Sequence, residues 1–328
     1  MTLRSPLALA LVGLAGLAAC APRPECADSA CEAIPSCPDS AFDEAAMRAD
    51  VAYLASEALD GRAPGTPGDD AARAFLHDRF ACLGLRPLPG APSFEQAFTD
   101  AEGHETANVV GYLPGADAGD ASDIVVVSAH FDHLGDGRLG ANDNASGVSG
   151  LLAIAQALSE AEPTDRTVVF AAFGAEESGM EGAAAFLDTP PEGFSPDDVV
   201  YDVNMDMIGT YGATGTVYAL GSLAGTEGRA AVAARRAEYP ELDVGLGEPS
   251  DLSDNEAFCS RGIPYLFFWT EDPDCYHARC DVPDQLDYPS MVEIARLTGQ
   301  VAADLADSDA DLRGAVAPGT DVCDRAGR

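Results

Sequence analysis

The amino-acid sequence predicts an α/β fold, a three-layer αβα sandwich with a mostly parallel central sheet, for most of its 328 residues. Two observations support this prediction. Short runs of apolar, β-branched residues alternate along the chain with longer segments of helical spacing, as they do where helices cover both faces of a parallel sheet. Hydrophobic residues make up 47% of the chain and charged residues 22%, which excludes a wholly disordered protein.

The predicted elements follow one another in a regular order. Helical spacing begins at 42–54 and 70–83, separated by a glycine- and proline-rich stretch at 61–68 that is expected to be a loop. Buried strands are expected at 124–129, 167–173, 199–208 and 263–269, and further helices at 148–158, 180–187, 228–239 and 291–305. No internal repeat or interior linker interrupts the series, so one folded domain is expected at 41–310, followed by an acidic tail at 311–328.

The net charge of the chain restricts its partners. The sequence carries 18 basic residues, all of them arginine, against 55 acidic ones, for a net charge of −37. A field of that sign repels phosphate backbones, so nucleic-acid binding is not expected. The same field favours cations, including metal ions.

The N-terminal segment predicts export. Residues 1–19 contain one early arginine, Arg4, and then a short apolar run that ends Leu-Ala-Ala before Cys20. This pattern resembles the lipobox of bacterial lipoproteins, which implies a signal peptide at 1–19 and a lipid anchor on Cys20. The alternative is an ordinary secretory signal cleaved after small residues. Either way the mature protein is expected to be exported, and the lipoprotein pattern implies the bacterial cell envelope, periplasmic or on the outer surface.

The remaining cysteines fit an oxidising compartment. Residues 20–40 are rich in cysteine and proline and have no periodicity, so they are expected to form a short tether closed by disulfides. Without Cys20, eight of the nine cysteines remain, and an even number is what disulfides require.

Residues that can bind metal follow the predicted strands. Ligands of open α/β sheets bind beyond the carboxyl ends of the strands, and imidazoles and carboxylates recur at that point here. Mixed imidazole and carboxylate donors suit zinc. Asp206 also lies next to apolar residues, where an unpaired carboxylate would be costly, so it needs an arginine or a metal as partner. The candidates are His130, Asp132, His133, Asp143, Glu176, Glu177, Asp206, Tyr276 and His277.

The segments around these residues carry a resemblance to a known family. They are Val-Val-Ser-Ala-His130-Phe-Asp132-His133-Leu-Gly, Gly140-Ala-Asn-Asp143-Asn-Ala-Ser-Gly, Ala175-Glu176-Glu177-Ser-Gly and Asn204-Met-Asp206-Met-Ile-Gly. They resemble the co-catalytic di-zinc peptidases, which include aminopeptidase Y, the secreted bacterial leucyl aminopeptidases, glutamate carboxypeptidase and, more distantly, glutaminyl cyclase. The similarity also extends to Gly61, Arg62 and 108–115, and covers about residues 45–305.

The resemblance implies a role for each residue. Asp143 would bridge two Zn²⁺ ions, His130 and Asp206 would complete one site, and Glu177 and His277 the other. Asp132 would accept the second N–H of His130 and fix its tautomer. Glu176 would be the general base and Tyr276 would bind the tetrahedral intermediate. Adjacent residues of an extended chain point opposite ways, so one of Glu176 and Glu177 can bind metal while the other transfers protons.

Several details near the site stay open or depart from the family. Cys275 and Cys280 flank His277, and the resemblance implies a disulfide there, with metal binding by the two thiolates as the alternative. The sequence has Ser253-Asp254-Asn255 where many relatives have Ser-Asp-His, which leaves local substrate contacts open. His133 is interpreted as a residue beside the ligands or on the surface. His77 and His104 are not expected in the site.

These observations predict an exported zinc-dependent aminopeptidase, anchored to the membrane through Cys20, that acts on peptides. The alternatives are a glutaminyl cyclase, a carboxypeptidase of the same fold, or a binding domain without catalytic activity. Relatives that cyclise glutamine usually lack the first histidine ligand, whereas His130 is present here. A carboxypeptidase for acidic C-termini would need a cationic pocket, which the sequence does not locate.

Overall fold

The computed structural model describes residues 37–116, 123–221, 226–250 and 252–314. The expected signal peptide, the anchor at Cys20, most of the expected tether and the chain after 314 lie outside the described residues. No helix within the described ranges is both long and apolar enough to cross a membrane.

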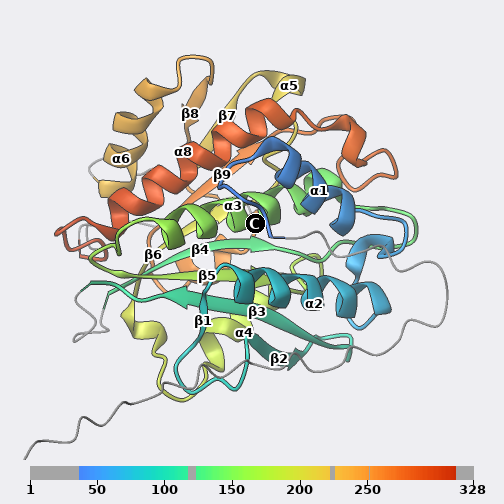
Figure 1. The fold of residues 1–328 in the computed structure, drawn as a ribbon, viewed down its shortest axis with the longest axis horizontal. Coiled ribbons are helices and arrows are strands. Elements are labelled where there is room, and N and C mark those ends of the chain that lie inside the picture. The colour runs from blue at the N-terminus through green and yellow to red at the C-terminus, as the bar shows by residue number, and fades with distance from the viewer. Residues whose placement is uncertain (1–36, 117–122, 222–225, 251, 315–328) are drawn as a thin grey trace, which may run out of the picture. The chain divides into compact units, whose positions relative to one another are not determined.

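The described residues form a nine-stranded sheet, which confirms the predicted α/β fold (Figure 1). Its order is β1-β3-β5-β4-β6-β9-β7-β8, and β2 pairs with β3. The four central strands β5, β4, β6 and β9 run parallel to one another, whereas β3 on one side and β7 on the other pair antiparallel with them. The strands are β1 (Arg86–Pro87), β2 (Glu95–Thr99), β3 (Glu105–Leu113), β4 (Ile124–His130), β5 (Thr167–Phe173), β6 (Val199–Met205), β7 (Val217–Leu220), β8 (Val244–Leu246) and β9 (Tyr265–Thr270).

Helices cover both faces of this sheet, because alternate residues of the central strands point to opposite sides. On β4, Val125 and Val127 join one buried cluster with α1, α2, α3 and α8, which lie in front of the sheet in Figure 1. Val126 belongs to a second cluster with α4 and α7. The helices are α1 (Glu44–Leu54), α2 (Pro67–Cys82), α3 (Gly147–Glu160), α4 (Glu181–Asp188), α5 (Tyr211–Thr214), α6 (Glu227–Arg235), α7 (Asn255–Cys259) and α8 (Tyr288–Ala306).

The six predicted helices and four predicted strands are all present, with bounds that differ by a few residues. The expected loop at 61–68 is wrong at both ends. A 3₁₀ turn covers Asp60–Arg62, and α2 begins at Pro67 because the Thr66 side chain accepts the N–H of Asp69 and caps the helix. Strands β1, β2, β3, β7 and β8 were not predicted. All of them except β3 have five residues or fewer, which is too short for a clear pattern.

One disulfide joins distant segments of the chain and another closes a short loop. Cys37 of the expected tether is bonded to Cys82 at the end of α2, and the expected Cys275–Cys280 disulfide is present. The five cysteines in the described part of the chain, Cys37, Cys82, Cys259, Cys275 and Cys280, are all disulfide-bonded. At the other end of the domain, Leu312 is buried in the main core, so packed structure extends past residue 310.

Candidate active site

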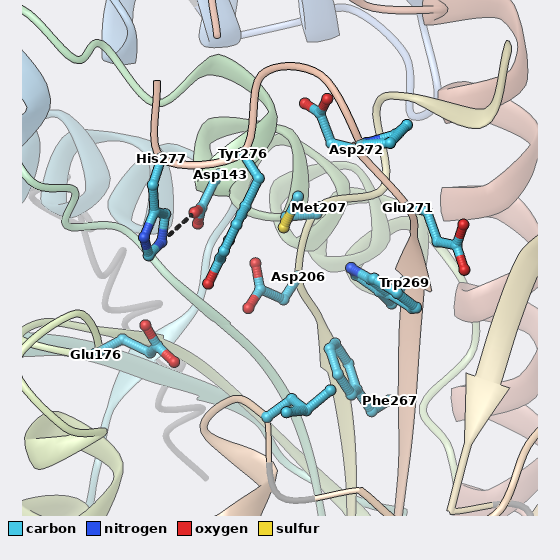
Figure 2. Close-up of a pocket in the computed structure, with 12 residues that line it drawn as sticks. Asp143, Glu176, Asp206, Met207, Phe267, Trp269, Glu271, Asp272, Tyr276 and His277 are labelled. Atoms are coloured by element: carbon cyan, nitrogen blue, oxygen red, sulfur yellow. Dashed lines mark ion pairs between the residues drawn. The ribbon is translucent and has the colours of Figure 1, made fainter. Parts of the chain in front are cut away.

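The predicted site residues come together at the carboxyl ends of the central parallel strands. His130 is the last residue of β4, Asp206 directly follows β6, and Glu176 and Glu177 lie just beyond β5. Asp143 lies in the irregular turn that precedes α3, and His277 lies in the disulfide-closed loop after β9. Because these strands are parallel, their ends meet at one edge of the sheet. Figure 2 shows four of these side chains gathered there: Asp143, Glu176, Asp206 and His277.

The first cluster joins an imidazole to two carboxylates. His130 Nε2 lies 3.3 Å from Asp143 Oδ1 and 3.2 Å from Asp206 Oδ1. The His130 side chain is fully buried and the two carboxylates are nearly so. One ligand atom from each of the three lies within 4.8 Å of the others, so all three can contact the same ion.

The second cluster uses the other oxygen of Asp143. His277 Nε2 lies 3.1 Å from Asp143 Oδ2 and 3.1 Å from Glu177 Oε2. Asp143 therefore presents Oδ1 to the first cluster and Oδ2 to the second. This arrangement of one carboxylate between two sets of donors is the one that a bridging ligand requires.

His133 also lies in this site, beside the proposed ligands. Of the two positions expected for it, the one on the surface is therefore wrong. Its side chain is fully buried, and its Nδ1 lies 2.6 Å from Glu177 Oε1. That oxygen is not the one that faces His277, so His133 and His277 contact opposite oxygens of Glu177. His77 and His104 lie elsewhere, beside Asp78 and Asp100 respectively.

The donor atoms of both clusters fit a divalent metal. Several of them are buried and have no hydrogen-bond partner, which is costly unless a cation contacts them. Imidazole nitrogen with carboxylate oxygen is a donor set that suits zinc. These atoms are His130 Nε2, Asp143 Oδ2 and Asp206 Oδ1 of the clusters, and Nε2 of the neighbouring His133.

The clusters also shift the pKa values of their members. Burial raises the pKa of Asp143, but its contacts with His130 and His277 outweigh that and hold it well below its usual range. The same contacts with Asp143 and Glu177 raise the pKa of His277 to about 10. Burial raises the pKa of Glu176 well above its ordinary value, since the opposing charge of His130 offsets only part of that effect.

Asp132 connects the two loops that carry the site. Its main-chain oxygen lies 3.2 Å from His130 Nδ1, and its carboxylate Oδ1 lies 3.6 Å from the same nitrogen. The carboxylate accepts the main-chain N–H groups of Glu176 at 3.0 Å and Glu177 at 3.3 Å. Glu176 and Glu177 lie in a bend and a turn rather than in extended chain. Their carboxylates face different imidazoles, His130 for Glu176 and His277 for Glu177.

Two buried residues that support the site were not singled out from the sequence. The carboxylate of Asp281 accepts the main-chain N–H groups of Asn142 at 2.6 Å and Asp143 at 3.0 Å. The fully buried Arg62 donates to the carbonyl oxygens of Phe131, Leu139 and Gly140, which lie in the segments that carry the ligands. The inclusion of Arg62 in the family resemblance was the only signal for it. Asp281 had none.

A cavity of about 390 Å³, here called the active-site cavity, opens beside the two clusters. Figure 2 shows Tyr276 and His277 on one side of it and Phe267 and Trp269 on another. Tyr276 is 57% exposed, and its ring stacks on that of His277 with centroids 3.8 Å apart. The cavity is lined by Asp143, Glu176, Asp206, Met207, Leu252, Phe267, Trp269, Glu271, Asp272, Pro273, Tyr276 and His277.

The segment that departs from the family is buried and directly follows Leu252 of the cavity lining. Asp254 and Asn255 are fully buried, and the Asn255 side-chain amide donates to the Ser250 carbonyl. Ser253 Oγ accepts a hydrogen bond from the Asn204 side chain at 3.0 Å. Asn255 does not line the active-site cavity.

Comparisons with known proteins agree with this geometry. A family model described as Peptidase family M28 matches residues 108–302, which is more than half of the chain. The chain is 33% identical over 156 residues to "Aminopeptidase YwaD" of Bacillus subtilis (strain 168), a match that covers 46% of this chain and 33% of that protein. It is 28% identical over 151 residues to "Probable lipoprotein aminopeptidase LpqL" of Mycobacterium tuberculosis, covering 45% of this chain and 29% of that one. These matches span about a third of the length of the two curated relatives.

Among solved structures, the fold is similar to that of BSAP, a zinc aminopeptidase from Bacillus subtilis. The TM-score is 0.68 at 17% sequence identity, and the match covers 83% of this chain and 97% of that one. At this identity the likeness concerns the fold.

Proposed function

Because this chain belongs to peptidase family M28, we propose that it is an exported, zinc-dependent aminopeptidase that removes N-terminal residues from peptides. One observation carries the proposal. Asp143 places one carboxylate oxygen against His130 and Asp206 and the other against Glu177 and His277. This supports two Zn²⁺ ions held by His130, Asp143, Glu177, Asp206 and His277, with Asp143 shared between them.

The proposed mechanism assigns a task to each further residue. Bound zinc would act as a Lewis acid that lowers the pKa of water to near neutral and polarises a peptide carbonyl. The Glu176 carboxylate, which lies beside His130 at 3.9 Å, takes the proton of the attacking water and returns it to the leaving amine. The Tyr276 hydroxyl donates to the oxygen on which negative charge develops. Asp132 holds the turn that carries Glu176 through the main-chain N–H groups of that turn.

Several features support the proposed export and membrane anchor. The five described cysteines are all in disulfides, which form and persist outside the cytosol. The sequence before Cys20 has the lipobox pattern, and one relative is named as a probable lipoprotein aminopeptidase. We therefore place the protein in the bacterial cell envelope, held by a lipid on Cys20.

The composition of the active-site cavity disfavours a carboxypeptidase for acidic C-termini. Such an enzyme needs cationic side chains to hold the substrate carboxylates, and no arginine is present among the described residues that line this cavity. A binding domain without activity is disfavoured because all five proposed ligands and Glu176 are present and in contact.

The proposal is tested by two measurements on the purified chain. Elemental analysis after dialysis against zinc is expected to give two zinc ions per chain, and fewer than one would contradict the shared Asp143 site. Hydrolysis of aminoacyl-p-nitroanilides is expected only with a free amino group, to stop with a chelator and to return with zinc. Hydrolysis of the N-acetylated substrates at the same rate would refute aminopeptidase activity.

A further inference from the structure

One wall of the active-site cavity has a distinctive order of side chains. Phe267, Trp269 and Glu271 are spaced by two residues along β9 and the residue that follows it, and all three line the cavity. Residues at this spacing lie on the same face of a strand. Figure 2 shows the three side by side along one ribbon, with Trp269 between Asp206 and Glu271. Along this wall Trp269 thus lies between Phe267 and Glu271, and it separates Asp206 of the first cluster from Glu271 (Figure 2).

The aromatic part of this wall is held in place by its neighbours. Trp269 pairs with Tyr218 of β7 across the sheet, and the two rings lie 5.7 Å apart. Phe267 is 2% exposed and packs in a small buried cluster with Tyr265 and Cys259. The rings are thus fixed before a ligand arrives, so binding requires little ordering of side chains.

The apolar surface continues to the mouth of the cavity. Leu252 and Tyr276, the two large hydrophobic side chains that are exposed in the described ranges, both line it. Exposed apolar side chains gathered at a cavity indicate a surface kept for a ligand.

Glu271 is the carboxylate of this cavity that remains available to a ligand. The neighbouring Asp272 is already in use, because its Oδ1 accepts the main-chain N–H of Cys275 at 2.9 Å. Asp143 and Asp206 belong to the first metal cluster, and Glu176, beside His130, is the proposed general base. No arginine is present among the described residues that line the cavity. The negative charge of Glu271 is therefore not paired with an arginine inside the cavity.

From this order of side chains we propose that the cavity selects peptides whose N-terminal residue is arginine or lysine. This inference rests on the proposed function. The aliphatic part of the substrate side chain lies along Trp269, next to the buried Phe267, and its charged end reaches Glu271. Long cationic side chains bury an apolar stem while the head keeps a polar partner, and a cation over a tryptophan face is attracted by the ring. The net charge of −37 adds a field that attracts cationic peptides.

The test compares substrates that differ only in the charged group. The full chain, loaded with zinc, is assayed on lysyl- and norleucyl-p-nitroanilide and on the arginyl and citrullinyl pair. We expect kcat/KM for the charged member of each pair to be higher by at least about tenfold, as a charge-assisted hydrogen bond provides. In Glu271→Gln, this ratio should fall towards one.

Asp274→Asn is the matched control for that variant. Asp274 is an exposed carboxylate on the same loop that does not line the cavity, so this change removes the same charge from the same region. We expect its substrate ratios to equal those of the wild type. If this ratio of kcat/KM falls equally in both variants, the preference arises from the negative field of the whole protein, and the role of Glu271 is refuted.

A second readout does not depend on turnover. L-arginine should bind the loaded enzyme more tightly than L-citrulline by calorimetry, with the difference lost in Glu271→Gln. Two results would overturn this inference while leaving aminopeptidase activity intact. One is equal kcat/KM for the lysyl and norleucyl substrates, and the other is a fall in kcat/KM in Glu271→Gln that is the same for both. Hydrolysis of no member of the panel by the zinc-loaded chain would instead refute the proposed function, and the inference with it.

Discussion

Replacing the buried carboxylate of Asp202 by an amide should remove a loss of stability that the wild type suffers between pH 5 and pH 7. The free energy of unfolding of the variant, relative to that of the wild type, should therefore increase over this range. Asp202 lies in β6 and is fully buried. Its Oδ1 accepts a hydrogen bond from Ser128 Oγ at 2.8 Å, whereas its Oδ2 has no hydrogen-bond partner. Burial therefore raises its pKa to about 8, and the carboxyl group keeps its proton in the folded protein at neutral pH.

The sign of the effect follows from the protons bound in each state. The unfolded chain loses this proton near pH 3.8 and the folded chain near pH 8, so the folded state holds the extra proton between those values. Stability then falls as the pH rises, by about 1.4 kcal/mol per pH unit for one proton. From pH 5 to pH 7 the contribution of Asp202 amounts to about 2–3 kcal/mol. Asp202→Asn has no charge to bury and removes this slope.

The assay is urea denaturation of the metal-free wild type and of Asp202→Asn at pH 5, 6 and 7. The unpartnered amide of the variant costs the same at every pH, and the other buried carboxylates titrate alike in both proteins. The difference between the two free energies of unfolding should therefore shift by about 2–3 kcal/mol in favour of the variant across this range. Parallel pH profiles for the two proteins would refute a protonated Asp202.

Three further predictions concern the site and the anchor. Glu176→Gln should keep its zinc and lower kcat about 10²–10⁴-fold, since only proton transfer is lost; near-normal turnover would mean that another group is the base. Asp281→Asn should lower zinc affinity about 10–100-fold in equilibrium dialysis. The reason is that the amide of the variant has one acceptor oxygen for the two main-chain N–H groups of Asn142 and Asp143, where the carboxylate has two. Equal affinity in this variant and in the exposed control Asp284→Asn would exclude a role of Asp281 in positioning Asp143. Cys20→Ala should move the protein from the membrane fraction to the soluble fraction, and unchanged fractionation would reject the lipid anchor.

Much of the site could be predicted because its residues follow strands with a clear pattern. The runs that became β4, β5 and β6 are continuous and apolar, so their ends could be located within a few residues. The carboxyl ends of parallel strands meet at one edge, which places His130, Glu177 and Asp206 near one another without further information. Asp143 and His277 lie in irregular segments, where their place after a predicted strand made them candidates and the family resemblance supplied their roles.

Other parts of the site had no comparable signal. His133 lies just past the end of β4, where the strand alternation ends, so the direction of its side chain depends on the loop that follows. Asp281 and Arg62 act through main-chain atoms, which every residue has, so their partners leave no mark in the sequence. The pairing of Cys37 with Cys82 is likewise one of many that the cysteine count allowed.

The sequence by itself determined the α/β fold, the series of central strands and the kinds of donor at their ends, because apolar periodicity and residue chemistry are local properties. Only the tertiary structure decided which atoms meet. It directed the two oxygens of Asp143 to different clusters, turned His133 towards Glu177 and set Glu271 beyond Trp269 in the cavity. Those contacts join segments far apart in the chain, and they depend on packing and on loop conformations that no local pattern encodes.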